Sequence, residues 1–474
     1  MIFLLTLLVL LFFAIKFMHS FHVQELASIF GMPMPKDQAV FTGVSVDSRL
    51  HRPENLFFSL PGAQTDGHHF LEKIASQGSK GAVVSRDYDG PDYGMLLIRV
   101  ENPLLALQNL ARLIIKQSKA RVVAVTGSVG KTTTKDFITT VLKEKFKVSS
   151  SPGNSNSQIG VPLAILNHTE GQEEIIVLEM GMSHPGNLKA LIDIAPPECA
   201  IITQVALAHA CNFDSLEAIA YAKAEILTHA STALAILHRD IINYSEIIKI
   251  GSCRKLSFSF DHPLADYSIA ATQTDGLAVR SKEQIYKLGS FPILGKHHQA
   301  NFLAAVACAE YFGMSPKEIA LGMSKLVLPA SRGQLIEKKG ILFINDVYNA
   351  SPLSVKAALK NIPSPKNGGR KVAVLADMLE LGQFSKKAHE EIGEYALNQV
   401  DSMFCYGAES RLIFDCWQKY GRHAYWYNHR AELVDALKSY LQEGDVVLIK
   451  GSKGTQISKL LEEWESSPND HIFS

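Results

Sequence analysis

Residues 121–134 constrain the fold more than any other segment, because they join an apolar run, a glycine turn and a helix start. They read RVVAVTGSVGKTTT, with Gly127 and Gly130 in the turn and Lys131 opening a Thr-rich helix. In this order backbone N–H groups face an anion, Lys131 adds charge, and Thr132 offers a hydroxyl to Mg²⁺. The segment predicts a nucleotide phosphate site, with an ordinary strand-to-helix turn as the alternative.

Short β runs alternate with helical patterns along the whole chain, which predicts α/β layers throughout. A small mixed α/β domain is expected over residues 21–119, and a central domain with a mostly parallel sheet over residues 120–328. A smaller Rossmann-like domain is expected over residues 329–474. The strand-like runs are residues 55–59, 81–85, 121–126, 174–179, 200–203, 232–237, 371–376, 402–406 and 445–450, and residues 104–118 are helical.

Residues 1–20 form an apolar N-terminal extension that ends near Lys16. Residues 2–15 are short for a membrane span, which needs about 20 apolar residues. No basic residue precedes them and no small-residue cleavage site follows, so a secretory signal fits poorly. Three interpretations remain: an over-extended start with Met18 as initiator instead of Met1, a weak membrane tether, or a signal peptide.

Charge and cysteine content exclude several classes of protein. The 474 residues carry 47 Lys and Arg against 47 Asp and Glu, so no net charge attracts nucleic acid or an anionic membrane. An anionic ligand must therefore be held in a local pocket. The 6 cysteines include no C-x-x-C pair, which argues against a disulfide scaffold or zinc ribbon and favours a reducing compartment.

The segment TGSVGKTT, residues 126–133, resembles the shortened P-loop of the Mur ligase superfamily, a group of ATP-dependent, amide-forming enzymes. The general motif places its first glycine where this chain has Val125, and that departure is shared by the Mur variant. The resemblance implies that the loop binds ATP through Gly127, Ser128, Val129, Gly130, Lys131, Thr132 and Thr133.

Three residues further along are candidate metal ligands: Glu179 after a strand, His209 in a later loop, and Lys223 on a helix. Taken alone, Glu179 is equally well a solvated strand end and His209 a satisfied histidine, and Lys223 is more simply interpreted as part of a solvated helix face. The resemblance implies that they bind two Mg²⁺ ions together with Thr132, with Lys223 carbamylated. It also implies catalytic roles for Lys131, His209 and Lys223.

The stretch INDVYNASPLS, residues 344–354, resembles the signature of the MurF type, which adds D-alanyl-D-alanine, with Ser351 in place of an Asn. The Asp-Asn-Pro-Arg motif of the diaminopimelate-adding type is absent. The resemblance implies that Asn301, Arg332 and Asp346 bind ATP. His238 stands where the family often has Asn, and we assign it no role.

Further segments resemble the family's substrate-binding loops. The first domain resembles its uridine-nucleotide unit, and the later segments its peptide-facing loops. The candidate substrate-binding residues are Ser48, Arg49, Asp66, Gly67, His68, Asn154, Asn156, Tyr348, Asn349, Lys450 and Lys453.

The resemblance implies ATP-driven addition of D-Ala-D-Ala to UDP-N-acetylmuramoyl-tripeptide through an acyl phosphate, with ATP and Mg²⁺ required. Because three ligands must meet in this reaction, we also expect the last domain to close over the P-loop. We expect a cytoplasmic monomer that takes small-molecule substrates, binds no nucleic acid and does not insert stably into membranes. The alternatives are another Mur or folylpolyglutamate-type ligase, a P-loop kinase or NTPase, and a noncatalytic, membrane-tethered nucleotide-binding protein.

Overall fold

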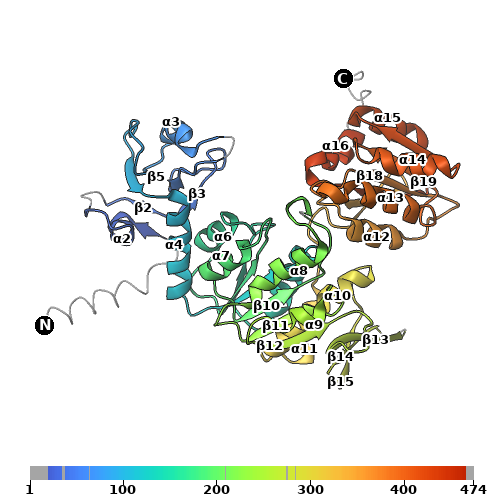
Figure 1. The fold of residues 1–474 in the computed structure, drawn as a ribbon, viewed down its shortest axis with the longest axis horizontal. Helices are drawn as coiled ribbons and strands as arrows, with labels where there is room; N and C mark the ends of the chain where they lie inside the picture. The colour runs from blue at the N-terminus through green and yellow to red at the C-terminus, as the bar shows by residue number, and fades with distance from the viewer. Residues whose placement is uncertain are drawn as a thin grey trace.

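The computed structural model describes residues 20–34, 38–62, 65–208, 210–273, 276–282 and 284–465. The chain forms three bodies that follow one another from the blue N-terminal end to the red C-terminal end (Figure 1). Residues 1–19 of the predicted extension and the candidate ligand His209 lie outside the described residues. Within the described ranges, no helix combines the length and apolar character needed to cross a bilayer.

The N-terminal body contains a small parallel sheet beside a two-stranded antiparallel ribbon. The ribbon pairs β1 (Phe21–His22) with β2 (Val40–Phe41). The sheet has the order β3-β4-β5-β6, formed by β3 (Gly43–Ser45), β4 (Asn55–Phe58), β5 (Gly81–Ser85) and β6 (Leu96–Val100). Its helices are α2 (Val23–Ile29), α3 (Leu71–Ser76) and α4 (Pro103–Gln117). Asn102 caps α4 by accepting a hydrogen bond from the Leu105 amide, and α4 leads toward the central body.

The central body is built on a nine-stranded sheet with the order β15-β14-β13-β12-β11-β10-β7-β9-β8. All its pairings are parallel except those that join β13, β14 and β15. The strands are β7 (Arg121–Thr126), β8 (Val148–Ser150), β9 (Ile175–Glu179), β10 (Cys199–Ile202), β11 (Leu234–His238), β12 (Arg254–Phe258), β13 (Tyr267–Gln273), β14 (Gly276–Ser281) and β15 (Gln284–Gly289).

Helices cover both faces of this sheet. Each strand contributes to the core on both faces, because its successive side chains point to opposite sides. Val122 and Ala124 of β7 lie in one apolar core, and Val123 and Val125 lie in another. The helices are α5 (Lys131–Leu142), α6 (Gly160–His168), α7 (Asn187–Ile194), α8 (Leu216–Ala224), α9 (Tyr244–Ile247), α10 (Lys296–Tyr311) and α11 (Pro316–Ser324). The sheet is therefore buried on both sides, as its near-continuous apolar strands predict.

The C-terminal body has a six-stranded sheet with the order β16-β17-β21-β18-β19-β20, parallel except for β16. Its strands are β16 (Gln334–Lys338), β17 (Ile341–Asp346), β18 (Lys371–Ala376), β19 (Ser402–Tyr406), β20 (Ala424–Tyr427) and β21 (Val446–Lys450). Its helices are α12 (Pro352–Lys360), α13 (Ser385–Ala396), α14 (Arg411–Lys419), α15 (Arg430–Tyr440) and α16 (Leu460–Glu465). These layers confirm the predicted three-domain α/β fold; the exact domain borders stay a prediction.

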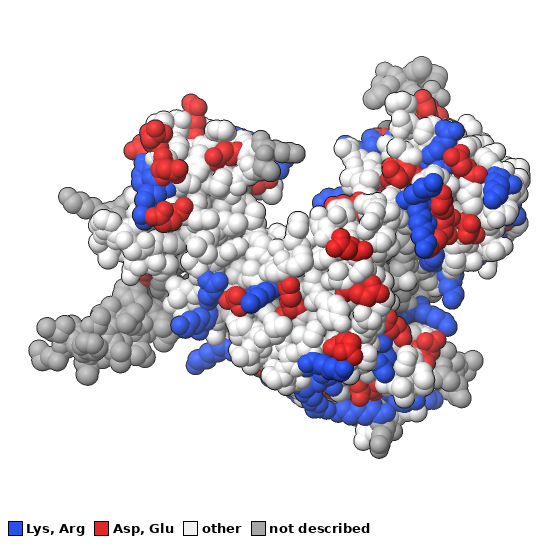
Figure 2. Space-filling view, viewed as in Figure 1, with Lys and Arg blue, Asp and Glu red and all other residues white. Residues whose placement is uncertain are grey.

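The N-terminal body shares an apolar core with the central body, whereas the C-terminal body has cores of its own. Buried residues of the N-terminal body, such as Phe58 and Val83, belong to the same apolar core as Val122 and Ile176 of the central sheet. The C-terminal body has its own two cores. Leu207 of the central body packs against both the shared core and one C-terminal core. Figure 2 shows an open hollow between the N-terminal and C-terminal bodies.

Candidate active site

The turn after β7 is held against the end of β10. Gly127 has a φ of +147°, and a Cβ there would lie 1.9 Å from the Thr203 hydroxyl oxygen. That hydroxyl donates to the carbonyl oxygens of Thr126, at 3.1 Å, and Val129, at 2.7 Å. Because a side chain would collide with the group that closes the turn, residue 127 must be glycine.

Lys131 and Asn301 lie against the same turn. Lys131 Nζ donates to the carbonyl oxygens of Gly127, at 2.9 Å, and Ser128, at 3.3 Å. Gly130 precedes α5 with a φ of +88°, and a Cβ there would lie 2.8 Å from Asn301 Oδ1 of α10. The P-loop, the N-terminus of α5 and the predicted nucleotide-binding amide therefore lie side by side.

Glu179 ends β9 beside the P-loop and is 1 % exposed. Its Oε2 accepts a 2.6 Å hydrogen bond from the Thr132 hydroxyl, and its Oε1 accepts one of 2.6 Å from Asn156 Nδ2. Arg332 Nη2 donates to the Thr132 hydroxyl oxygen at 2.8 Å. Thr132 thus connects the buried carboxylate to an arginine from the start of the C-terminal segment.

Lys223 lies on α8 and is 2 % exposed. In the described part of the chain its ammonium has no hydrogen-bond or ion-pair partner. Burial lowers the pKa of Lys223 well below its usual value, and the charge of Lys131 lowers it further. Burial also lowers the pKa of Lys131, against the opposing effect of Glu179. Both effects favour the neutral amine of Lys223 more than in an exposed lysine.

Two histidines begin α10 one turn before Asn301. The Nδ1 atoms of His297 and His298 are both buried without a hydrogen-bond partner in the described residues. Burial lowers the pKa of His297 to about 4, although Asp346 acts in the opposite direction. The rings are therefore neutral near pH 7 and keep unused hydrogen-bonding positions beside the P-loop.

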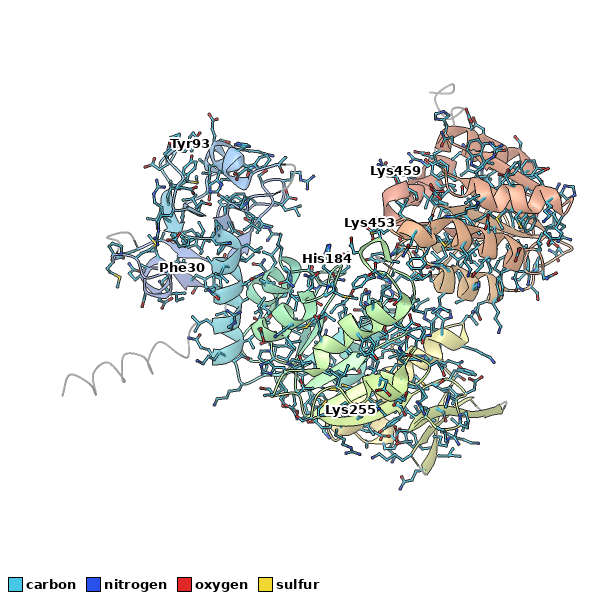
Figure 3. The ribbon with its side chains drawn as sticks, in the orientation of Figure 1. Phe30, Tyr93, His184, Lys255, Lys453 and Lys459 are labelled. Atoms are coloured by element: carbon cyan, nitrogen blue, oxygen red, sulfur yellow. The ribbon has the colours of Figure 1, made fainter. Side chains whose placement is uncertain are left out.

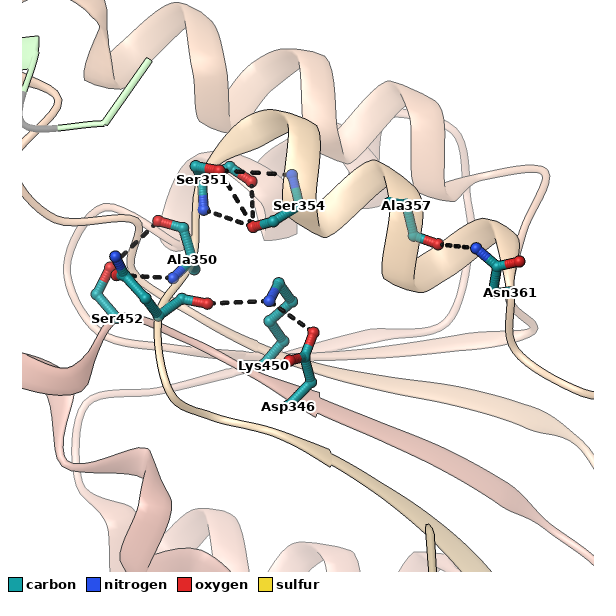
Figure 4. A network of polar contacts seen from close by, with 9 residues as sticks. Asp346, Ala350, Ser351, Ser354, Ala357, Asn361, Lys450 and Ser452 are labelled. Atoms are coloured by element: carbon teal, nitrogen blue, oxygen red, sulfur yellow. Dashed lines mark hydrogen bonds and ion pairs between the residues drawn. The ribbon is translucent and has the colours of Figure 1, made fainter. Parts of the chain in front are cut away.

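Lys450 and Asp346 end the adjacent strands β21 and β17 and form an ion pair of 2.6 Å. Lys450 is 3 % exposed, and its ammonium also donates to the carbonyl oxygen of Asn349 at 2.9 Å (Figure 4). This ammonium therefore already holds two partners. The predicted contact of Lys450 with a peptide carboxylate stays a prediction. Arg332 lies over the ring of Tyr348, 3.7 Å from its centroid.

Ser351 has a structural role in the signature segment. Its side chain accepts a hydrogen bond from the Ser354 amide and caps α12, with Pro352 in the first helical turn (Figure 4). Ser and Asn are both strongly favoured at this position of a helix. Replacement of the family's usual Asn by Ser351 therefore preserves the start of α12.

One cavity of about 1390 Å³ brings most of the predicted residues together. Its wall comes from the central body and from the strand ends of the C-terminal body, and Lys453 lies at the edge of the latter facing the hollow (Figure 3). The predicted residues that line it are Ser128, Val129, Gly130, Lys131, Thr132, Thr133, Asn154, Asn156, Glu179, Asn301, Arg332, Asp346, Tyr348, Asn349, Lys450 and Lys453.

The candidate residues of the N-terminal body do not line this cavity. Asp66 accepts hydrogen bonds from the His68 amide and ring, while His68 Nε2 accepts one from the Ser85 amide. A Cβ at Gly67 would lie 2.6 Å from the Leu60 backbone nitrogen. These three residues therefore also close a turn.

The other two N-terminal candidates differ in exposure. Ser48 is buried, whereas Arg49 is exposed and pairs with Asp47 at 2.6 Å, which lowers the pKa of Asp47 to about 2. The uridine-nucleotide role of all five residues stays a prediction.

The structure adds residues to which the sequence analysis assigned no role. His238 and Asp240 line the cavity, and Asp240 accepts a 2.8 Å hydrogen bond from Ser259. Lys135 is fully buried one turn after Lys131. The position of His238 at the end of a strand could have indicated that it lies at the site, whereas no feature of the sequence distinguished Lys135. No group of three or more His, Cys, Asp or Glu side chains is arranged to hold a metal ion among the described residues.

Two protein-family models match the chain. The Mur ligase middle domain matches residues 125–309, and the Mur ligase, glutamate ligase domain matches residues 331–453. A Bacillus subtilis (strain 168) protein named "UDP-N-acetylmuramoyl-tripeptide--D-alanyl-D-alanine ligase" is 34 % identical over 91 % of this chain and 95 % of its own. An Escherichia coli (strain K12) protein of the same name is 29 % identical over 94 % of this chain and 98 % of its own.

Solved structures agree with these matches. MurF from Acinetobacter baumannii has a TM-score of 0.83 and 26 % identity, and the match covers 94 % of this chain and 99 % of that one. MurF ligase from Thermotoga maritima in complex with ADP has a TM-score of 0.76 and 29 % identity, covering 89 % and 97 %. The chain therefore belongs to the Mur ligase family, and within it to the MurF type.

Proposed function

We propose that this chain is the ATP-dependent ligase that joins D-alanyl-D-alanine to UDP-N-acetylmuramoyl-tripeptide. The observation that carries the proposal is the single cavity in which the P-loop, Glu179 and the Asp346–Asn349 signature meet. Relatives that bear this activity in their names align with the chain over almost its entire length.

The chemistry requires two anions to meet. The tripeptide carboxylate attacks the γ-phosphate of ATP to give an acyl phosphate and ADP, and the dipeptide amine then displaces phosphate to form the amide. Carboxylate and phosphate repel strongly where water is excluded. Lys131 and the N-terminus of α5 supply positive potential to the cavity, and Arg332, which bonds the Thr132 hydroxyl, adds to it.

The residues at the end of β9 fit a divalent cation. Among the described residues Glu179 is a buried carboxylate bonded only to neutral donors, and the Thr132 hydroxyl lies 2.6 Å from it. Oxygen ligands of this kind suit Mg²⁺, which would neutralise charge on the phosphate oxygens when bound. We propose that Thr132 and Glu179 contribute to this site, together with His209 and a modified Lys223.

Lys223 is proposed to carry a carbamate. Reaction of its neutral amine with CO₂ joins Nζ to the carbon and releases a proton, so a cation becomes an anion. Its burial, its lack of a partner in the described residues and its lowered pKa support this chemistry.

Isotope labelling and rescue test the carbamate. Protein equilibrated with ¹³C-bicarbonate should show a carbamate carbon signal that is absent from Lys223→Ala. The variant should be nearly inactive and partly restored by a short-chain carboxylate. Full activity of Lys223→Ala without added carboxylate would refute the modification.

The activity itself is tested by mass spectrometry of products formed from ATP, Mg²⁺, UDP-N-acetylmuramoyl-tripeptide and D-Ala-D-Ala. We expect one new amide and one ADP per turnover. ATP turnover that continues undiminished without D-Ala-D-Ala would instead indicate a P-loop kinase or NTPase. We further propose that the enzyme is a cytoplasmic monomer; sedimentation of the full chain tests its oligomeric state.

A further inference from the structure

Lys135 is a buried lysine on α5 for which the proposed reaction has no direct use. It is 2 % exposed and does not line the cavity. Its ammonium donates to the carbonyl oxygens of Ser151, at 2.7 Å, and Gly153, at 3.1 Å, and pairs with Asp136 at 2.9 Å. An ammonium has three donors, so these partners account for all of them. Because a buried charge without partners costs free energy, the bonds that hold this ammonium also hold the backbone of Ser151 and Gly153 in place.

The segment that Lys135 holds reaches Glu179 at two places. The Glu179 amide donates to the Ser151 hydroxyl at 3.0 Å, which fixes the backbone at the end of β9. Asn156 Nδ2 donates to Glu179 Oε1 at 2.6 Å, which orients the carboxylate. The backbone of Asn156 is also held, because its main-chain carbonyl oxygen accepts a 2.7 Å hydrogen bond from the Gly181 amide.

Residues 151–156 contain no helix or strand, so their shape depends on such anchors. Lys131 and Lys135 are four residues apart on α5 and therefore lie on one face of that helix. The first ammonium bonds the P-loop and the second bonds residues 151–153. Helix α5 thus sets the spacing between the phosphate-binding turn and the segment that orients Glu179.

We infer that Lys135 is a positioning residue, which fixes residues 151–156 and through them the Glu179 carboxylate for divalent-cation binding. The inference rests on the proposed function, because that function makes Glu179 a metal ligand. Lys135 does not line the cavity in which nucleotide and metal would bind. Its effect is carried by Ser151 and Asn156, and residues that orient a metal ligand typically alter metal affinity about 10- to 100-fold when removed.

Manganese binding to the full-length protein saturated with ADP tests the inference, with electron paramagnetic resonance as the measurement. Lys135→Met keeps the length of the side chain and removes its donors. We expect it to raise the Kd for Mn²⁺ about tenfold, while the Kd for ADP measured without metal changes less than about twofold. Lys135→Arg, which retains donors, should recover part of the affinity. Lys143→Met, an exposed lysine at the end of the same helix, is the control.

Hydrogen exchange supplies a second measurement that does not depend on activity. The amides of Glu179 and Gly181 should exchange faster in Lys135→Met than in the control, because their acceptors belong to the released segment. Should Lys135→Met fail to fold, Ser151→Ala removes the acceptor of the Glu179 amide alone and should weaken Mn²⁺ binding in the same direction.

An unchanged Kd for Mn²⁺ in a folded Lys135→Met or Ser151→Ala variant would overturn the inference. An equal loss of ADP affinity without metal would overturn it as well, since that result indicates a general defect of α5. Failure of the proposed function is seen separately, as wild-type protein that binds Mn²⁺ and ADP normally but makes no amide.

Discussion

Lys131 is the residue on which phosphate binding should depend most directly. Its ammonium lies on the P-loop at the N-terminus of α5 and donates to two carbonyl oxygens of that turn. Lys131→Ala should lower the rate of amide formation by about 10²- to 10³-fold, because charge that stabilises the transferring phosphoryl group is lost. Product formation measured beside Lys143→Ala gives the comparison. Near-normal turnover would contradict the assigned role.

His297 should make the stability of the protein depend on pH. Its pKa is about 4 in the folded chain and its ordinary value is 6.5, so the unfolded chain binds more protons between these values. Stability is therefore complete above about pH 6.5 and falls as the pH decreases toward 4. We expect the unfolding free energy to drop by about 1 to 2 kcal/mol more between pH 7.5 and pH 5 in wild type than in His297→Gln.

Urea denaturation at the two pH values measures this difference. Equal pH dependence in both proteins would show that His297 is protonated normally in the folded state. His229→Gln, at an intermediate-exposed position away from the cavity lining, is a suitable control.

Several site residues could be predicted because their types and positions carried enough information. Lys131 and Thr132 follow β7 and Glu179 ends β9, and the carboxyl ends of these parallel neighbours lie together, so the meeting of the three residues follows from topology. Lys135 could not be predicted, because a lysine in a helix of ordinary composition is expected in solvent. Only the path of residues 151–156, which no periodic pattern encodes, gives that lysine its buried partners.

At the scale of elements, the turn between β7 and α5 depends on glycine in a way that can be measured. Gly127→Ala should lower the unfolding free energy by more than about 2 kcal/mol, because its Cβ would collide with the Thr203 hydroxyl in an unfavourable backbone conformation. Gly153→Ala is the matched control. Its φ is +51° with nothing within 4 Å of the added Cβ, so it should cost about 1 kcal/mol.

Thermal or urea unfolding separates these two costs. Equal destabilisation by both substitutions would mean that backbone conformation alone, without the contact to Thr203, determines the requirement for glycine.

Strands with continuous apolar runs were predicted closely, and strands of mixed apolar and polar sequence were missed. The predicted runs 121–126, 371–376 and 402–406 coincide with β7, β18 and β19. The meander formed by β13, β14 and β15 at one end of the sheet was not predicted, because apolar and polar residues are mixed along its strands. The hydroxyls of Tyr267, Ser281 and Tyr286 bond Glu310 of α10 and hold this meander, and such long-range contacts leave no local pattern.

At the scale of the whole molecule, the shared core predicts that the N-terminal and central bodies behave as one unit. Asn167 of α6 reinforces this union, because its side-chain amide accepts from the Val44 amide at 2.8 Å and donates to the Val44 carbonyl oxygen at 3.0 Å. Asn167→Ala should lower the unfolding free energy by about 1 to 2 kcal/mol and speed hydrogen exchange at Val44. It should also raise KM for the UDP-linked substrate more than KM for ATP.

His168→Ala is the control for this prediction, since His168 is the exposed neighbour on the same helix. Unaltered exchange at Val44 in Asn167→Ala would show that the apolar core alone holds the two bodies together.

The C-terminal body is attached more sparingly. Its contacts with the central body include the Cys211 amide on the Glu380 carbonyl oxygen at 3.0 Å and the packing of Leu207. Separate cores and few shared contacts favour rotation of this body as a unit, as the expected closure over the P-loop requires.

The hydrogen bond from Arg332 to the Thr132 hydroxyl has a thermodynamic consequence. Because it joins the segment that leads into the C-terminal body with the P-loop, nucleotide occupancy and interdomain orientation are linked variables. Any free energy by which bound nucleotide favours one orientation must reappear as tighter nucleotide binding by that orientation. Substitution of Arg332 should therefore weaken this coupling, so that nucleotide binding and the orientation of the C-terminal body become more nearly independent.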